Sequence, residues 1–324
     1  MLSEFTLIQN YFVRDQNQTS DPRFALGIGD DCALLQPTPG YQLAISSDML
    51  VSGRHFFPDV DPYSLGHKCL AVNLSDLAAM GAHPLAFTLA IALPDADPKW
   101  LTAFSQGMFA LADQHRCRLI GGDTTKGPLT ISITIFGELP PNAALRRDAA
   151  KPGEDIWISG SLGDARLALA AYRNELSLEP EQHKLAAQRM HLPTPRIALG
   201  VALRGIAHAA LDISDGLSGD LSHILSASKV GAQLNIDALP IGEVLQSQSL
   251  IRRREYCFNG GDDYELCFTA PIEQRDAVIA AAIASQTPVT RVGKIDSEPG
   301  LRLFDAEGKS IELENHSFDH FNAS

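Results

Sequence analysis

Hydrophobic residues recur with a helical period in some segments and a strand period in others along the whole chain. Residues 85–93 alternate strictly between apolar and other positions, as in a half-buried strand, whereas Leu2, Phe5 and Ile8 follow helical spacing. This mixture predicts an α/β (α+β) protein. The predicted helices cover residues 2–12, 61–80, 98–117, 164–174, 196–204, 219–228 and 272–284, and the predicted strands cover residues 41–45, 85–93, 118–120, 129–135, 156–158, 209–213, 232–236, 264–269, 301–305 and 310–313.

A polar stretch near the middle of the chain interrupts this pattern. Pro140 and Pro141 precede it, and the turn-forming run 151–153 follows it. The length of 324 residues is enough for two ordinary domains. We therefore predict two mixed α/β domains, at residues 1–142 and 150–324.

Composition and charge narrow the class of protein. Apolar residues make up 45% of the chain, and the formal net charge is -13. Such an acidic chain argues against a nucleic-acid partner, but bound cations could still admit a nucleotide substrate. The longest apolar run, residues 85–93, is too short to span a bilayer, and the N-terminus lacks the basic region of a signal peptide. We therefore expect no membrane partner. The five scattered cysteines, with no CxxC pair, favour a reduced, cytoplasmic protein.

The candidate chemistry lies in aspartates that have glycine or serine neighbours, at predicted strand ends or in loops. Carboxylates gathered in one place repel each other and need cations among them. Oxygen ligands select hard ions, and magnesium is the usual partner of nucleotide phosphates. The pattern therefore suits several magnesium ions bound to a polyphosphate. The segments are Gly29–Asp31, Ser46–Asp48, Ser75–Asp76, Gly122–Asp123, Asp212–Gly216 and Gly261–Asp263.

Simpler interpretations exist for each segment. An aspartate beside glycine or serine is most often a turn or helix-capping residue. Asp76 differs, because it lies inside a predicted helix among apolar residues, where a buried carboxylate needs a partner. Arg146 and Arg147 could reach a phosphate or lie in a solvated linker. Cys32 could be a nucleophile, but we interpret it as a small buried cysteine. The common phosphate-binding loop GxxxxGK[ST] is absent.

Ordered motifs along nearly the whole chain resemble the thiamine-monophosphate kinase family. The tail Phe318–Phe321 also resembles that family's ending. One departure is Asp262, where the family usually has glutamate. The matching motifs are GDDCA (29–33), SDMLVSGRHF (47–56), NLSDLAAMGA (73–82), GGDT (121–124), DISDGL (212–217) and GGDDYEL (260–266).

The resemblance implies an aminoimidazole-ribonucleotide synthetase-like fold of two α/β domains. The N-terminal domain would bind ATP and magnesium and form a homodimer through its sheet, and the C-terminal domain would complete the active site. The implied reaction is direct, in-line transfer of the ATP γ-phosphoryl group to thiamine phosphate. The products would be thiamine diphosphate and ADP, which places the reaction in thiamine diphosphate biosynthesis. Several magnesium ions would serve as cofactor, and ATP would be the co-substrate.

The resemblance also assigns roles to residues of this chain. Asp48, Asp123 and Arg147 would be catalytic. Thiamine phosphate would contact His55, Asp262 and Phe321, with Phe318 as the alternative aromatic residue. The implied ATP contacts are Gly122, Asp123, Arg147 and Ser214, and the implied magnesium ligands are Asp30, Ser46, Ser47, Asp48, Asp76, Asp123, Asp212 and Asp215.

Two alternatives remain open from the residues. The first is a sister enzyme of the same superfamily. Selenophosphate synthetase is expected to carry a reactive cysteine in its N-terminal loop, and the hydrogenase-maturation relative is expected to carry one at its C-terminus. Both cysteines are missing here. Aminoimidazole-ribonucleotide synthetase itself lacks a GDDYEL-type motif. The second alternative is a non-catalytic ion- or nucleotide-binding protein, which would not need His55, Asp262 and Phe321.

Overall fold

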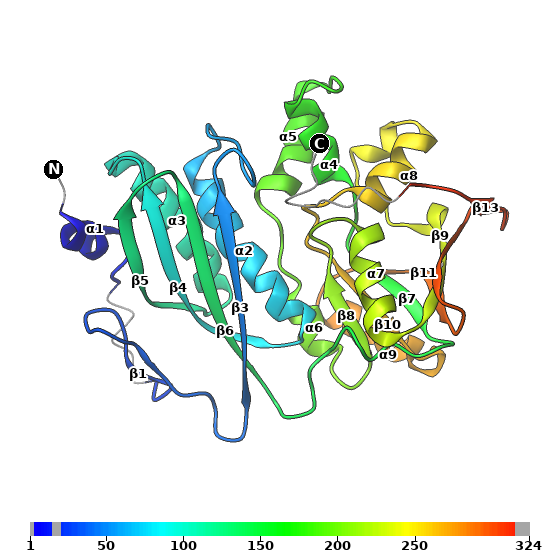
Figure 1. The fold of residues 1–324 in the computed structure, drawn as a ribbon, viewed down its shortest axis with the longest axis horizontal. Helices are drawn as coiled ribbons and strands as arrows, with labels where there is room; N and C mark the ends of the chain where they lie inside the picture. Colours follow the sequence, from blue (N-terminus) through cyan, green and yellow to red (C-terminus); the bar gives the residue numbers. More distant parts are fainter. Residues whose placement is uncertain (1–2, 15–20, 315–324) are drawn as a thin grey trace. The chain divides into compact units, whose positions relative to one another are not determined.

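The computed structural model describes residues 3–14 and 21–314, and the chain forms two compact units (Figure 1). The N-terminal unit comprises residues 1–77 and 82–142. The C-terminal unit comprises residues 78–81 and 143–324. Each unit combines a sheet with helices, so the predicted α/β class is confirmed. Within the described ranges, no helix is long and apolar enough to cross a membrane.

A four-stranded sheet forms the centre of the N-terminal unit, in the order β3-β6-β4-β5. Strands β4 and β5 are parallel, and the other neighbours are antiparallel. Two long helices cover one face of the sheet, and no helix of the described residues lies on its other face (Figure 1). The elements are α1 (Glu4–Tyr11), β1 (Phe24–Leu26), β2 (Leu34–Leu35), β3 (Gln42–Val51), α2 (Pro62–Ala79), β4 (His83–Leu93), α3 (Pro98–Gln114), β5 (Arg118–Lys126) and β6 (Thr130–Leu139).

Alternation along the strands explains how this unit packs. Ile131, Ile133 and Ile135 of β6 are buried, and the residues between them are only partly buried. The two helices approach closely at glycines. A Cβ atom at Gly66 of α2 would lie 2.0 Å from the carbonyl oxygen of Phe104, so only glycine allows this helix contact.

A seven-stranded sheet forms the centre of the C-terminal unit, in the order β13-β12-β9-β11-β7-β10-β8. Only β12 and β9 are parallel. Every residue of β7 and β10 is buried, as expected for interior strands covered on both faces, and the edge strand β8 is buried as well. The strands are β7 (Asp155–Ser159), β8 (Ala209–Asp212), β9 (Gly231–Asn235), β10 (Leu266–Ala270), β11 (Val289–Asp296), β12 (Gly300–Phe304) and β13 (Ser310–Ile311). The helices are α4 (Asp164–Tyr172), α5 (Pro180–His191), α6 (Ile197–Ala202), α7 (Leu217–Ser228), α8 (Leu250–Asn259) and α9 (Arg275–Ala284), with short 3-10 turns at 236–238, 245–247 and 272–274.

Two expectations about the aspartate motifs are wrong in detail. The segment Ser46–Asp48 was expected to follow a strand, but β3 continues through it to Val51 because it pairs with β6 along its full length. Asp123 likewise lies inside β5, which pairs with β4 as far as Lys126. Both motifs therefore project from sheet surfaces.

Five elements of the described residues are not predicted by the sequence pattern, namely β1, β2, α5, α8 and β11, and α5 and β11 show why. Helix α5 buries only Ala186, Ala187 and Met190, so its apolar spacing is weak. Strand β11 carries Arg291 and Lys294 and has a register irregularity, which interrupts its alternation. The sequence therefore lacks a clear period at both places.

Candidate active site

In the N-terminal unit, the motif on β3 divides its side chains between two faces. Successive strand residues point to opposite faces, so Ser46 and Asp48 share the face of the buried Leu50. Ser46 Oγ donates a hydrogen bond to Asp76 Oδ2 on α2. The expected partner of Asp76 is therefore Ser46, and Asp76 is half-buried instead of fully buried.

The hydroxyl of Ser47 lies on the opposite, exposed face of β3. It donates to the carbonyl oxygen of Ile133 at 3.2 Å and lies 3.0 Å from Thr134 Oγ1. Of the three residues of this motif, only Ser46 and Asp48 turn their side chains toward the helix face that carries Asp76.

The motif on β5 needs glycine for a close strand contact. A Cβ atom at Gly122, whose φ is 147°, would lie 1.8 Å from the carbonyl oxygen of Leu89 on β4. The next residue, Asp123, is exposed and lies opposite Ala90 in the register. The tight pairing therefore fixes the backbone that presents the Asp123 carboxylate.

Two further predicted residues of this unit lie in turns. Asp30 is exposed, and its Oδ1 accepts the backbone N–H of Asp31 at 2.9 Å. His55 is half-buried, and its Nδ1 accepts the backbone N–H of Val51 at 3.0 Å. A neutral His55 ring therefore carries its proton on Nε2. The interpretation of Cys32 as buried is wrong, because it lies in an exposed loop next to Asp31.

In the C-terminal unit, a buried carboxylate organises the turn after β8. Asp220 Oδ2 accepts the backbone N–H groups of Ser214, Asp215 and Gly216, each at 3.1 Å. Burial, and to a smaller extent the nearby charge of Asp215, raise the pKa of Asp220 to about 7. Asp212, at the end of β8, is also buried. Sequence reasoning missed Asp220, although an acidic residue in the first turn of a helix is a capping signal.

The GGDDYEL motif packs directly on this turn. The backbone N–H of Asp262 donates to the carbonyl oxygen of Ser214 at 2.8 Å, and that of Tyr264 donates to Ile213 at 2.8 Å. A Cβ atom at Gly261 would lie 2.4 Å from the Ser214 carbonyl oxygen. The structure therefore brings Asp262 and Ser214 together, as two parts of one surface.

The basic residues at the start of the C-terminal unit have different surroundings. Arg146 forms a two-point ion pair with Asp148, whose pKa is lowered by the hydrogen bonds from that guanidinium. Arg147 is exposed, and Ser228 Oγ donates to its carbonyl oxygen at 2.8 Å. No acidic side chain of the described residues forms an ion pair with Arg147, in contrast to Arg146. The Arg147 guanidinium can therefore bind an anionic ligand. Phe318 and Phe321 lie outside the described residues.

The donor atoms fit magnesium ions. All residues assigned to the metal offer oxygen, the ligand that this hard ion prefers. Among residues 3–14 and 21–314, no three His, Cys, Asp or Glu side chains are gathered into a metal site by themselves. Magnesium sites need only one or two carboxylates when phosphate oxygens and waters complete the shell. The Ser46–Asp76 pair with Asp48 in one unit, and Asp212 with Asp215 in the other, offer such partial sets.

Comparison with known families defines the class of protein. The AIR synthase related protein, N-terminal domain, matches residues 29–139, and the corresponding C-terminal domain matches residues 151–306. The fold and its aspartate-bearing strands and turns are therefore those of an AIR synthase related protein. A thiamine-monophosphate kinase from Salmonella typhimurium is 45% identical over 325 residues, covering 98% of each chain. This chain belongs to the thiamine-monophosphate kinase family.

Solved structures agree with this assignment. The crystal structure of thiamine-monophosphate kinase from Stenotrophomonas maltophilia K279a has a TM-score of 0.87 and 45% identity, covering 96% of this chain and 98% of that one. AaThiL complexed with AMPPCP and TMP has a TM-score of 0.75 and 28% identity, covering 86% and 88%. The resemblance seen in the motifs and the expected fold are both confirmed.

We expect Asp220→Asn to loosen the turn at 214–216, because an amide oxygen replaces the carboxylate that accepts three N–H groups. The protein should lose about 1–3 kcal/mol of stability, and the amides of these three residues should exchange hydrogen faster. Thermal unfolding and hydrogen–deuterium exchange measure both effects. Asp276→Asn is the matched control, since Asp276 is an exposed acid in the first turn of α9. Unchanged exchange at 214–216 would contradict the capping role.

Proposed function

We infer that this chain is a thiamine-monophosphate kinase, which transfers the γ-phosphoryl group of ATP to thiamine phosphate and gives thiamine diphosphate and ADP. The observation that carries this inference is the 45% identity to the Salmonella typhimurium enzyme over 98% of both chains. That span includes every aspartate motif of this sequence. AaThiL, which was solved with AMPPCP and TMP, provides support from structure.

For this reaction the protein has to position the two reacting groups and to neutralise the negative charge of the polyphosphate. The acceptor is itself a phosphate, which is ionised at neutral pH, so transfer needs no dedicated general base. Bound magnesium ions would supply positive charge to the polyphosphate, and the protein holds the reacting groups in line. The proposed ligands are Asp30, Ser46, Ser47, Asp48, Asp76, Asp123, Asp212 and Asp215, of which Ser47 would contribute its hydroxyl from the opposite face of β3.

The ATP side of the site combines close backbone approach with one cation. Gly122 allows the backbone of β5 to lie close to Leu89 on β4, and this fixed backbone carries the next residue, Asp123. Ser214 lies in the turn that Asp220 caps. The exposed guanidinium of Arg147 can bind phosphate oxygens and stabilise the charge that develops during transfer.

The acceptor side uses His55 and Asp262, together with Phe321 beyond the described residues. His55 Nδ1 accepts a hydrogen bond from the Val51 N–H, so the neutral ring donates from Nε2–H, which is the group proposed to contact a phosphate. Asp262 adopts φ 66°, and aspartate tolerates this left-handed backbone better than longer side chains do. The replacement of the family's usual glutamate keeps the negative charge and suits this backbone.

The state of the cysteines favours a cytoplasmic location. All five are free, as is usual in the cytoplasm, where thiols stay reduced. Four of them are buried, at positions 69, 117, 257 and 267. We therefore propose a cytoplasmic enzyme.

Chromatography of a reaction containing purified protein, Mg-ATP and thiamine phosphate tests the proposed function. We expect thiamine diphosphate and ADP in equal amounts, and no product when EDTA removes magnesium. Asp48→Asn and Asp123→Asn should each lower activity by about 100-fold or more while the circular dichroism spectrum stays unchanged. Asp276→Asn, an exposed change on α9, should keep full activity. Full activity in either of the first two variants would refute the metal assignment.

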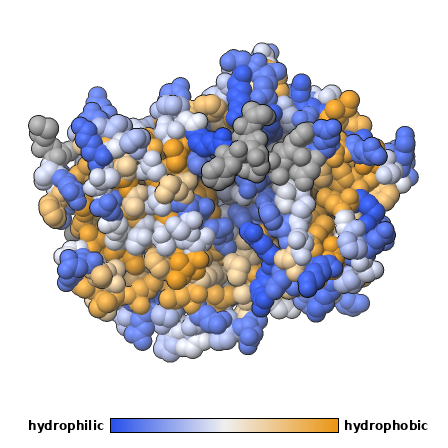
Figure 2. Space-filling model, in the orientation of Figure 1, coloured by the Kyte–Doolittle hydropathy of each residue, from blue (hydrophilic) through white to orange (hydrophobic). Residues whose placement is uncertain are grey.

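We also propose a homodimer that forms through the helix-free face of the N-terminal sheet. Leu43, Ile45 and Met49 lie on this face of β3, where Ile45 is 61% and Met49 58% exposed. Figure 2 shows hydrophobic residues gathered over the N-terminal unit. Apolar residues exposed together on one face are typical of a protein interface.

Ile45→Lys combined with Met49→Lys should convert the dimer to monomers, because the interface would have to bury two new charges. Light scattering coupled to size-exclusion chromatography measures the mass. Ile283→Lys is the control, since Ile283 is 74% exposed on α9 and should leave the mass unchanged. A wild-type monomer, or a dimer in the doubly charged variant, would contradict this interface.

A further inference from the structure

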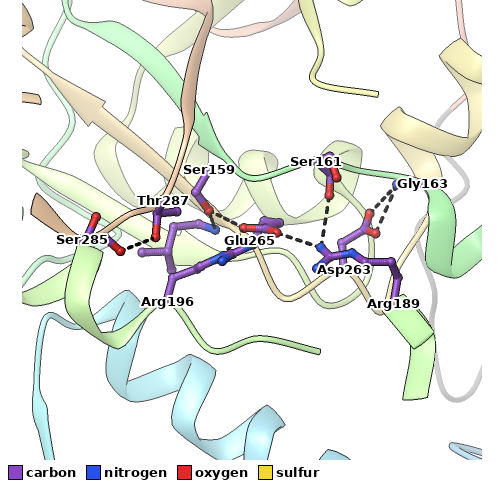
Figure 3. Close-up of polar contacts among 10 residues, drawn as sticks. Ser159, Ser161, Gly163, Arg189, Arg196, Asp263, Glu265, Ser285 and Thr287 are labelled. Atoms are coloured by element: carbon purple, nitrogen blue, oxygen red, sulfur yellow. Dashed lines mark hydrogen bonds and ion pairs between the residues drawn. The ribbon is translucent and has the colours of Figure 1, made fainter. Parts of the chain in front are cut away.

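A completely buried carboxylate lies next to the turn that presents Asp262. Glu265 is 0% exposed, and four hydrogen bonds hold it (Figure 3). Arg196 donates from Nε to Oε2 at 2.6 Å and from Nη2 to Oε1 at 2.5 Å. Arg189 Nη2 donates to Oε1 at 2.8 Å, and Ser159 Oγ donates to Oε2 at 2.7 Å. We call Glu265, Arg189, Arg196 and Ser159 the glutamate clamp.

The glutamate clamp joins parts of the unit that are far apart in sequence. Ser159 ends β7, Arg189 lies on α5, Arg196 precedes α6, and Glu265 precedes β10. Ser159 Oγ also accepts the backbone N–H of Leu266 at 2.8 Å. A Cβ atom at Gly160 would lie 2.0 Å from Glu265 Oε1, so the adjacent glycine leaves room for the carboxylate. The chain at 265–266 is therefore fixed from several sides.

A second tether holds the residue two positions earlier. Asp263 is buried, and both of its carboxylate oxygens accept the backbone N–H of Gly163, at 2.9 and 3.1 Å. Arg189 also donates to the carbonyl oxygen of Ser161 in the same loop, at 3.4 Å (Figure 3). The Asp263 tether and the glutamate clamp therefore bind the motif to one loop between β7 and α4.

The turn between these tethers has an unusual backbone. Asp262 has φ 66° and Tyr264 has φ 51°, both in the left-handed region that side chains rarely adopt. Such conformations persist only where the surrounding structure fixes them, and they gather at functional sites. Tyr264 donates from its hydroxyl to Asp262 Oδ1 at 3.2 Å, so the side chains of the turn are linked as well.

Stability alone does not explain a charge cluster at this place. Two arginines and a glutamate lose hydration when buried, and well-packed apolar residues often stabilise a core as well or better. A buried ion pair can instead select one local conformation out of several. Here the selected conformation is the left-handed turn that carries Asp262.

We propose that Glu265, Arg189 and Arg196 are positioning residues for the acceptor: they fix the turn at 262–264 so that the Asp262 carboxylate meets thiamine phosphate. This proposal rests on the proposed function, in which Asp262 contacts the acceptor. The ATP-side turn at 214–216 has its own anchor in Asp220. Loosening the glutamate clamp should therefore affect the acceptor more than the nucleotide.

Arg196→Met tests the proposal, because it keeps much of the side-chain volume and removes both bonds to Glu265. We expect the KM for thiamine phosphate to rise about tenfold and the KM for ATP to stay within about twofold. Arg196→Lys keeps the charge and should recover part of the loss. Ser159→Ala, which removes one neutral donor, is a milder second variant if Arg196→Met folds poorly.

The chain offers a matched control at the opposite end of β7. Arg275 makes the same two-point contact with the buried Asp155, at 2.5 and 2.8 Å. Arg275→Met should leave both KM values unchanged. An equal rise in both KM values, or a fall in kcat alone, in Arg196→Met would show a merely structural role and overturn the proposal.

Hydrogen–deuterium exchange supplies a measurement that does not depend on activity. The amides of Asp262 and Tyr264 should exchange faster in Arg196→Met than in the wild type or Arg275→Met, since the turn loses its anchor. Unchanged exchange would overturn the positioning role even in an active enzyme. If the wild type made no thiamine diphosphate, the proposed function would fail, and the exchange would still decide whether the glutamate clamp fixes the turn.

Discussion

Carboxylates can be gathered in a protein only if something neutralises or anchors each of them, and this requirement shapes both units. The buried acids are anchored by the protein: Glu265 by arginines, and Asp220 by three backbone N–H groups. Among the acids at the sheet and turn surfaces, Asp123 is exposed to solvent, where a cation can reach its carboxylate. Glu265 and Asp220 therefore hold the backbone of the two turns in place, and the more accessible acids are among the ligands that we propose for magnesium.

Close backbone contacts give these carboxylates a rigid support. Gly122 lets β5 pair tightly with β4, and Gly261 lets the GGDDYEL turn pack on Ser214. The left-handed backbone at Asp262 then accounts for a departure that the motif alone left unexplained, since aspartate suits this φ of 66°. Glycine positions and unusual φ values thus connect the local sequence to the geometry of the proposed site.

Much of the fold could be predicted, because long elements such as α3 and β4 have clear apolar periods. Helix α5 could not, since few of its residues are buried. The continuation of β3 through Asp48 depends on pairing with β6, which no local pattern reveals. The motifs did indicate the proposed site residues, and the position of Asp220 in the first turn of α7 was an overlooked local signal, whereas Glu265 gains its role only from tertiary contacts.

The most direct measurement is a crystal structure of this protein grown with Mn²⁺, AMPPCP and thiamine phosphate. Manganese takes magnesium-type oxygen sites and has a measurable anomalous signal. Anomalous peaks should lie beside carboxylates from the set Asp48, Asp76, Asp123, Asp212 and Asp215, with the acceptor at Asp262. Peaks remote from these aspartates, or an acceptor bound away from Asp262, would contradict the account.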